Sequence, residues 1–286
     1  MTEPTVSSQP PAEPVRARGS LALRQPIPRW QALLLGVVCL ASCGLLWWVA
    51  TLGPGEERLV GPLILPSPAE TFGKFPSLWF EEAFARNLFA TLWRVAMGFS
   101  LAVMIGVPLG VLAGCFPRVY AFLAPLIAFG RNIPVAALVP LVIFAVNYDF
   151  IFSRGENRKI MFIFIACVAF VLADTARAIM DVSERYVDTA FTLGASRWQT
   201  IIKVLVPLAM PTVFSSCRLM FGIAFGYIML AEITREPDTL GGVGFQINTF
   251  QRIGSREEVY LIILIVPLVA LVVDQFLYWV QRQMFP

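Results

Sequence analysis

The sequence contains no histidine, and few of its residues are charged. Only 14% of its 286 residues are Asp, Glu, Lys or Arg, compared with about 25% in an average soluble protein. Without histidine there is no imidazole general base, no histidine proton relay and no histidine metal ligand. The formal net charge of +3 is too small to indicate a nucleic-acid partner. Composition therefore argues against zinc enzymes, histidine-based catalysts and nucleic-acid-binding proteins.

Two further absences narrow the possible functions. The five cysteines predict neither a metal site nor a disulfide, because Cys39 and Cys43 lie inside an uncharged apolar run and the other three are scattered. The chain also has no glycine-rich loop followed by Lys and Ser or Thr, the pattern that cradles nucleotide phosphates. If ATP drives this protein, the nucleotide must bind to another polypeptide.

Apolar residues are abundant, and they are arranged in long runs. The chain is 57% hydrophobic with a mean hydropathy of +0.72, and a run of about 20 apolar residues is long enough to span a bilayer. We predict an all-α, polytopic membrane protein with six transmembrane helices. The predicted spans cover residues 32–52, 88–116, 119–146, 160–181, 208–231 and 259–281.

The order of the spans and of the segments between them divides the chain into three predicted regions. Residues 1–28 are rich in Pro, Ser, Glu and Arg, which predicts a disordered tail. Residues 29–85 hold the first span and the loop that follows it, and residues 86–282 form the main transmembrane domain. The connection 147–159 is expected to be a polar loop, and Pro125, Pro134 and Pro140 are expected to break the third span.

Gly106, Gly110 and Gly114 form a stripe at four-residue spacing in the second span. Small residues at this spacing let two helix backbones approach closely in lipid. The stripe predicts either a helix contact within one subunit or a seam between two copies, and we favour the first.

A polar stretch of helical length, Asp188–Pro207, separates the fourth and fifth predicted spans. This stretch resembles the cytoplasmic loop motif of permease subunits of ABC importers. The shared features are an acidic residue, two small residues after it, a glycine six positions after the acid, and a later aliphatic residue followed by proline. Three substitutions relative to the usual motif are conservative. The matching positions are Asp188, Thr189, Ala190, Gly194, Val204, Val206 and Pro207, and Arg197 lies in the same stretch.

Two other stretches, Leu65–Glu70 and Arg131–Leu141, are similar to the nitrate, sulfonate, taurine and bicarbonate branch of the same family. The glycines 241–244 that follow Glu232 resemble the glycine-rich segment of the family as a whole. The resemblance implies a type I importer fold with a short cytoplasmic coupling helix at 188–198, where Gly194 lets the chain turn. It also implies that a separate ATPase subunit binds ATP and Mg²⁺, and that this chain binds no cofactor.

The resemblance further implies partners and a location. A second permease copy, most simply an identical one, and an external solute-binding protein are expected, with the latter docking on loops 53–87, 147–159 and 233–256. Lys and Arg are evenly divided between the two sides, nine against nine, so the positive-inside rule does not decide the orientation. The family motif places both termini in the cytoplasm of a bacterial inner membrane.

Charged residues inside spans are costly and often functional. We expect Arg131, with Asn132, to face a central cavity and attract a small anion. Arg94, Arg218 and Glu232 are further candidates for the pathway, with the alternative that each arginine pairs with a carbonyl or an acid such as Glu232. An ion-coupled transporter and a membrane-embedded enzyme remain alternative functions.

Overall fold

Helices account for all the regular structure in the described part of the chain. The computed structural model describes residues 27–54, 58–145, 155–233 and 241–285. The longer helices are α1 (Arg29–Ala50), α3 (Phe84–Cys115), α4 (Pro117–Asn132), α5 (Val135–Ala145), α6 (Gly155–Met180), α9 (Val206–Glu232), α10 (Val243–Ile253) and α11 (Arg256–Met284). The shorter ones are α2 (Pro68–Gly73), η1 (Ser77–Glu81), α7 (Glu184–Thr192), α8 (Arg197–Thr200) and η2 (Ile201–Leu205). The predicted tail at 1–28 lies almost entirely outside the described residues.

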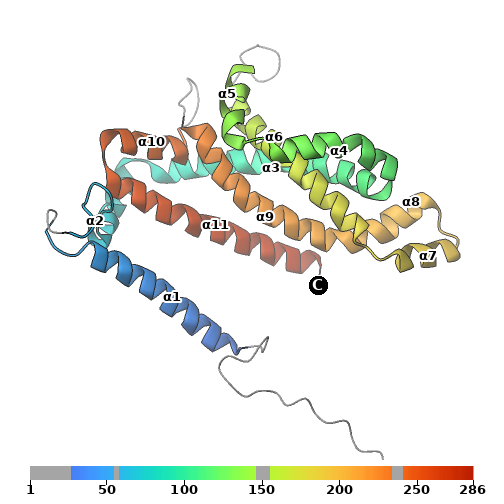
Figure 1. The fold of residues 1–286 in the computed structure, drawn as a ribbon, viewed down its shortest axis with the longest axis horizontal. Helices are drawn as coiled ribbons and strands as arrows, with labels where there is room; N and C mark the ends of the chain where they lie inside the picture. The colour runs from blue at the N-terminus through green and yellow to red at the C-terminus, as the bar shows by residue number, and fades with distance from the viewer. Residues whose placement is uncertain (1–26, 55–57, 146–154, 234–240, 286) are drawn as a thin grey trace, which may run out of the picture.

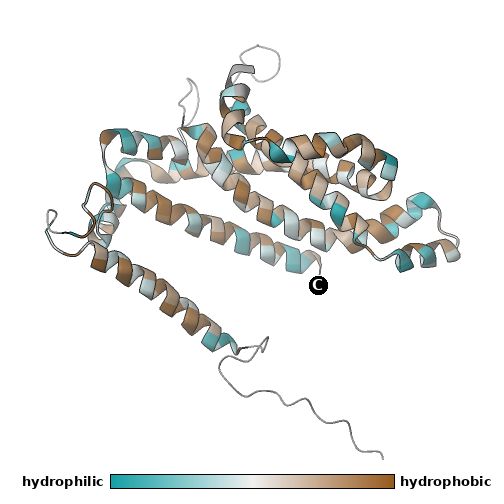
Figure 2. Ribbon diagram, viewed as in Figure 1, coloured by the Kyte–Doolittle hydropathy of each residue, from teal (hydrophilic) through white to brown (hydrophobic). Residues whose placement is uncertain are grey.

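Five of these helices are long and apolar enough to cross a membrane: α1, α3, α6, α11 and the continuous helix Arg197–Glu232, which comprises α8, η2 and α9. Figure 1 shows α2 and α10 at one end of the bundle and α7 and α8 at the other. Hydrophobic residues follow the long helices, and hydrophilic ones gather on α7 and at the start of α8 (Figure 2). The all-α membrane fold is therefore confirmed.

The third predicted span is divided into two helices, α4 and α5. They have 16 and 11 residues, fewer than the roughly 20 that span a bilayer. The break falls at Ile133, whose φ of −64° and ψ of 125° are extended. A residue before proline is pushed out of the α region, and Pro134 has no N–H to donate. Pro125 and Pro140 lie inside α4 and α5, so only one of the three prolines breaks the helix.

The predicted polar loop 147–159 is partly helical. The helix α6 begins at Gly155, so residues 155–159 form its first turns, and residues 146–154 lie outside the described ranges. Lys159 is buried, although the sequence suggested an exposed connection. This correction matters because Glu156 of this turn enters the charge cluster described below.

The glycine stripe of α3 packs against α6 in the same chain. A Cβ atom at Gly110 would lie 2.6 Å from Cβ of Thr175, and one at Gly114 would lie 2.6 Å from Cβ of Ile179. Gly98 and Gly106 make the same close approach to α6 further along. The prediction of a contact within one subunit is confirmed, and α3 and α6 are backbone-to-backbone neighbours over most of their length.

The main apolar core lies where α5 and α9 pack on this helix pair. Buried residues from α3, α5, α6 and α9 form one cluster, and Phe99 meets Phe221 edge to face with ring centroids 5.5 Å apart. By contrast, no residue of α1 is buried within this chain.

The short helix α2 begins with a capping box. Ser67 accepts a hydrogen bond from the Glu70 backbone N–H, and the Glu70 carboxylate accepts one from the Ser67 N–H. Arg58 binds the same carboxylate through two nitrogens, at 2.9 and 3.1 Å. The hydrogen bonds from Arg58 lower the pKa of Glu70 to about 2, so this pair stays ionised at any pH the cell experiences.

We expect Gly110→Leu to destabilise the protein, because the new side chain would force α3 away from α6. Overpacking of this kind costs ~1–3 kcal/mol, a fall in Tm of roughly 2–12 °C for a chain of this size. Thermal unfolding of the detergent-solubilised protein measures it. Gly222→Ala in α9 is the matched control, because a Cβ there meets no atom within 4 Å. Equal effects of the two substitutions would contradict the packing described here.

Candidate functional site

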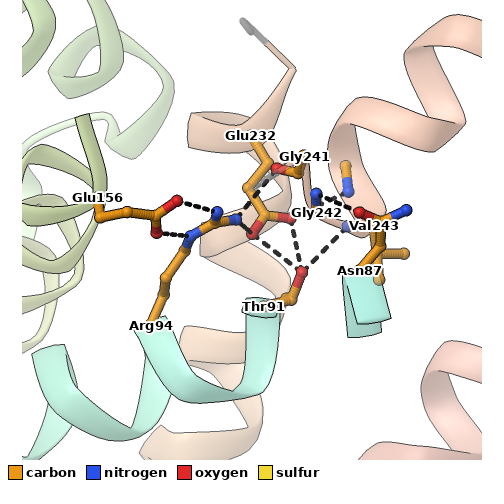
Figure 3. Close-up of polar contacts among 9 residues, drawn as sticks. Asn87, Thr91, Arg94, Glu156, Glu232, Gly241, Gly242 and Val243 are labelled. Atoms are coloured by element: carbon orange, nitrogen blue, oxygen red, sulfur yellow. Dashed lines mark hydrogen bonds and ion pairs between the residues drawn. The ribbon is translucent and has the colours of Figure 1, made fainter. Parts of the chain in front are cut away.

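A charge cluster centred on Arg94 is buried near the end of the bundle that carries α10. The Arg94 side chain is 0% exposed. Its Nε and Nη2 atoms each donate to one oxygen of Glu156, both at 2.6 Å. Its Nη1 atom donates to Glu232 and, at 3.1 Å, to the carbonyl oxygen of Gly241. Figure 3 shows the guanidinium held between the two carboxylates, which come from the start of α6 and the end of α9.

The Glu232 carboxylate is also 0% exposed, and two groups besides Arg94 bind it. The hydroxyl of Thr91 lies 2.9 Å from both of its oxygens and donates to them. The same hydroxyl accepts a hydrogen bond from the Val243 N–H at 3.0 Å. The Gly244 N–H donates to Glu232 at 3.1 Å. A buried carboxylate is costly without such partners, and here it has both a cation and hydrogen bonds.

Glycine is required in the loop that wraps this carboxylate. Gly242 has a φ of +114°, and a Cβ there would lie 2.4 Å from Cδ of Glu232. Its N–H donates to the side chain of Asn87 at 3.2 Å. The predicted glycine-rich segment therefore works as a close-fitting cover over Glu232. It leads into α10 and lies between Glu232 of α9 and Asn87 of α3.

Two of the predicted pathway residues, Arg94 and Glu232, thus bind each other. The sequence allowed such a pairing of an arginine with an acidic residue as the alternative to a role in the pathway. Because neither side chain is exposed, neither can contact a solute in this conformation of the single subunit, and their predicted pathway role is untested. Glu156, Thr91 and Asn87 were missed by sequence reasoning, since two lie in an apolar helix and Glu156 lies in a segment expected to be a loop.

Arg218 belongs to a second ion pair, between α9 and α11. Its Nε lies 2.9 Å from a carboxylate oxygen of Asp274. Its guanidinium also sits over the ring of Tyr278, 4.9 Å from the centroid, and Nη1 donates to Gln281 at 3.3 Å. The Arg218 side chain is 20% exposed and that of Asp274 is 36% exposed. This ion pair is therefore partly accessible at the surface of the subunit.

Arg131 and Asn132 lie at the end of α4, and both are exposed. The Asn132 side chain donates to the Ala128 carbonyl at 2.8 Å, and Arg131 lies over the ring of Phe170, 5.5 Å from its centroid. At Gly130, α4 comes so close to α6 that a Cβ would lie 2.5 Å from that of Ala169. Ala169 is near the middle of α6, so Arg131 lies level with the middle of that helix.

The polar stretch between the fourth and fifth spans folds as two helices joined by a turn at Gly194. The helix α7 ends in a Schellman motif, in which the Ala195 N–H donates to Ala190 at 3.0 Å and the Gly194 N–H donates to Phe191 at 2.9 Å. Gly194 has a φ of +81°, which suits glycine. Ser196 and Gln199 then form a capping box that starts α8.

Large apolar side chains on this helix–turn–helix are exposed, which is unusual for a polar surface. Leu193 is 82% exposed and Trp198 is 60% exposed. Asp188, Thr189 and Arg197 are exposed beside them, whereas Ala190 is buried. A hollow between α7 and the following helix is lined by residues of both, among them Thr189, Gly194 and Lys203. Pro207, at the start of α9, follows the π-helical turn η2.

Comparisons with known proteins agree on one family. Residues 106–286 match the family model described as the binding-protein-dependent transport system inner membrane component. The chain is 30% identical over 265 residues to the bicarbonate transport system permease protein CmpB of Synechococcus elongatus, covering 90% of this chain and 92% of the relative. It is 28% identical to the taurine transport system permease protein TauC of Escherichia coli, with 93% of each chain covered.

A solved structure gives the same fold. An inward-facing structure of the MetNI methionine ABC transporter superposes with a TM-score of 0.62. The match covers 74% of this chain and 99% of that chain, at 17% sequence identity.

We expect Gly242→Ala to destabilise the protein more than Gly254→Ala does. Both glycines have a positive φ, so both substitutions strain the backbone, by about 1–2 kcal/mol in the left-handed conformation of Gly254. The strain at Gly242 is about 1–3 kcal/mol, because its φ of 114° and ψ of 164° lie in a region that essentially only glycine adopts. Only the first also drives a Cβ into Glu232, because nothing lies within 4 Å of a Cβ at Gly254. Thermal unfolding of both variants in detergent makes the comparison. If Gly254→Ala is the more damaging, the glycine loop is not the tight cover we describe.

Proposed function

Because this chain belongs to the family of binding-protein-dependent transport system inner membrane components, we propose that it is the membrane-spanning subunit of an ATP-driven importer. A separate ATPase subunit binds ATP and Mg²⁺ and supplies the energy. Two permease subunits, most simply identical, surround the solute pathway and alternate between outward-open and inward-open states. This chain transports the solute and catalyses no reaction.

The surface formed by α7, Gly194 and α8 supports the proposed contact with the ATPase. It combines exposed apolar side chains, Leu193 and Trp198, with exposed charged ones, Asp188 and Arg197. A protein interface typically has this composition, with an apolar centre and a polar rim. The Schellman motif at Gly194 fixes the direction of the turn, so the surface is shaped before the partner arrives. The observation that carries the proposal is this exposed, preformed surface at one end of the bundle.

The same assignment orients the chain. If α7 and α8 face the cytoplasm and the ATPase, α2 and α10 lie at the opposite, external end of the bundle (Figure 1). The start of α1 and the end of α11 then both lie on the cytoplasmic side of a bacterial inner membrane. The external solute-binding protein docks at the α10 end.

Arg131 supports a small anionic cargo. A charged side chain exposed to lipid at the middle of a span costs roughly 2.5–3.5 kcal/mol on insertion scales. Arg131 is exposed level with the middle of α6, and within the described residues it lies over the ring of Phe170 and forms no ion pair. We therefore propose that it faces water between the two permease copies and attracts an oxyanion such as bicarbonate, nitrate or the sulfonate of taurine.

We expect Gly194→Val to separate the permease from its ATPase. Valine is strongly disfavoured at a φ of +81°, so the turn must open and the surface lose its shape. The variant should still insert into the membrane, because no atom of the described residues beyond the neighbouring ones lies within 4 Å of a Cβ at this position. Recovery of the ATPase with an affinity-tagged permease, together with solute uptake, measures the loss.

Gly194→Asn is the matched control, since asparagine tolerates a left-handed backbone. It should retain most of the ATPase and most of the uptake. Normal ATPase recovery and uptake in Gly194→Val would overturn the coupling role.

We expect Arg131→Gln to reduce uptake without affecting stability, because the side chain is exposed and only its charge is removed. Arg131→Lys, which keeps the charge, should transport better than Arg131→Gln. Radiolabelled bicarbonate, nitrate and taurine are tested on the wild type first, and the variants with whichever of these it imports. Wild-type uptake by Arg131→Gln would exclude Arg131 from the pathway.

A further inference from the structure

The segment that joins α1 to α3 exposes an unusual number of large apolar side chains. Leu63 is 80% exposed and Phe80 is 81% exposed. The others in residues 59–80 that are exposed are Leu59, Ile64, Phe72, Phe75 and Trp79. We refer to residues 59–80 as the connecting segment. Many exposed large apolar side chains within one short segment indicate contact with a partner protein or with lipid.

The depth of the connecting segment is fixed by its contacts with two membrane helices. The indole N–H of Trp47, one turn before the end of α1, donates to the Pro66 carbonyl at 2.9 Å. The Trp47 ring also meets that of Phe72, with centroids 6.2 Å apart. The hydroxyl of Tyr260, just over one turn into α11, donates to the Ile64 carbonyl at 2.7 Å. With a rise of 1.5 Å per residue, these contacts lie about 5–6 Å inside the ends of the two helices.

The inner side of the connecting segment is firmly packed, so the outer side has a constant orientation. Leu78 of η1 is 1% exposed and belongs to an apolar cluster with Phe84, Phe250 and Ile262. Trp79 meets Phe84 with ring centroids 5.9 Å apart. The exposed side chains on the other side therefore cannot turn inward to escape water.

The two charged residues within the connecting segment, Glu70 and Lys74, are both paired. Arg58 binds Glu70 through two nitrogens, and Lys74 lies 3.2 Å from Glu258 at the start of α11. Short helices satisfy most of the backbone within residues 68–81. Paired charges, internally bonded backbone and exposed aromatic rings together suit the boundary between lipid headgroups and acyl chains.

We propose that the connecting segment lies in the bilayer interface at the α2 end of the bundle, with Leu63, Phe75 and Phe80 in contact with lipid. The segment is then a membrane anchor that holds the joined ends of α1, α3 and α11 at one depth. This assignment does not depend on the ATPase contact or on the solute. It also restricts the external solute-binding protein to the remaining surface at that end, around α10.

A photoreactive amino acid tests the proposal. Benzoylphenylalanine is placed at Leu63 or at Phe80 in the full chain, in native membranes with its partner subunits present, and irradiated. Mass spectrometry then identifies the adducts. Leu193 provides the protein-facing control, because its exposure of 82% in the single chain is nearly that of Phe80 and it belongs to the surface proposed to contact the ATPase. Lipid adducts at 63 and 80 should exceed those at 193 several-fold.

Two results would overturn the proposal. One is cross-linking of positions 63 and 80 mainly to a protein, either the solute-binding protein or a second permease copy. The other is a lipid yield no higher than at position 193. A nitroxide at position 80 in a cysteine-free chain gives an independent reading, because a lipid-facing site is more accessible to oxygen than to a water-soluble nickel chelate. The reverse order of accessibility would also exclude contact with lipid.

Discussion

The salt bridges of Arg94 hold together one end of this bundle. A single guanidinium, from which water is excluded, binds a carboxylate at the start of α6 and another at the end of α9. Thr91 and the glycine loop then attach α10 to the same carboxylate. Buried ion pairs seldom add net stability over apolar packing, but losing one partner is very costly. The cluster therefore specifies which helix ends meet, and the apolar packing elsewhere supplies most of the stability.

Most of the fold could be predicted from sequence because lipid imposes simple rules. Backbone groups in a membrane must bond internally, so long apolar runs become helices, and five of the six predicted runs are single helices. The glycine stripe predicted a close helix pair, and α3 and α6 form it. The proline pattern predicted a broken third span, but only Pro134 breaks it. The sequence could not show which of the three prolines breaks the helix, because that depends on how the surrounding helices pack around each of them.

The buried cluster was less predictable. Arg94, Glu232 and the glycines were each recognised, and a pairing of Arg94 with an acid was considered. The geometry that unites them depends on Glu156, which lies 62 residues from Arg94 in sequence and was assigned to a loop. No periodicity or local motif carries that information. The turn at Gly194, by contrast, is a local feature, and a glycine after a short amphipathic helix is a strong signal for it.

The helix that begins beside the exposed turn at Gly194 is uninterrupted from Arg197 to Glu232, a length of 36 residues. At 1.5 Å per residue this corresponds to a rod of about 54 Å, longer than the hydrocarbon core of a bilayer. The π-helical turn at η2 keeps its backbone bonded where Pro207 would otherwise interrupt it. One end of this helix lies at the exposed turn, and the other end carries the Glu232 carboxylate that binds Arg94. One continuous helix therefore connects the exposed turn at one end of the bundle with the carboxylate under the glycine loop at the other end.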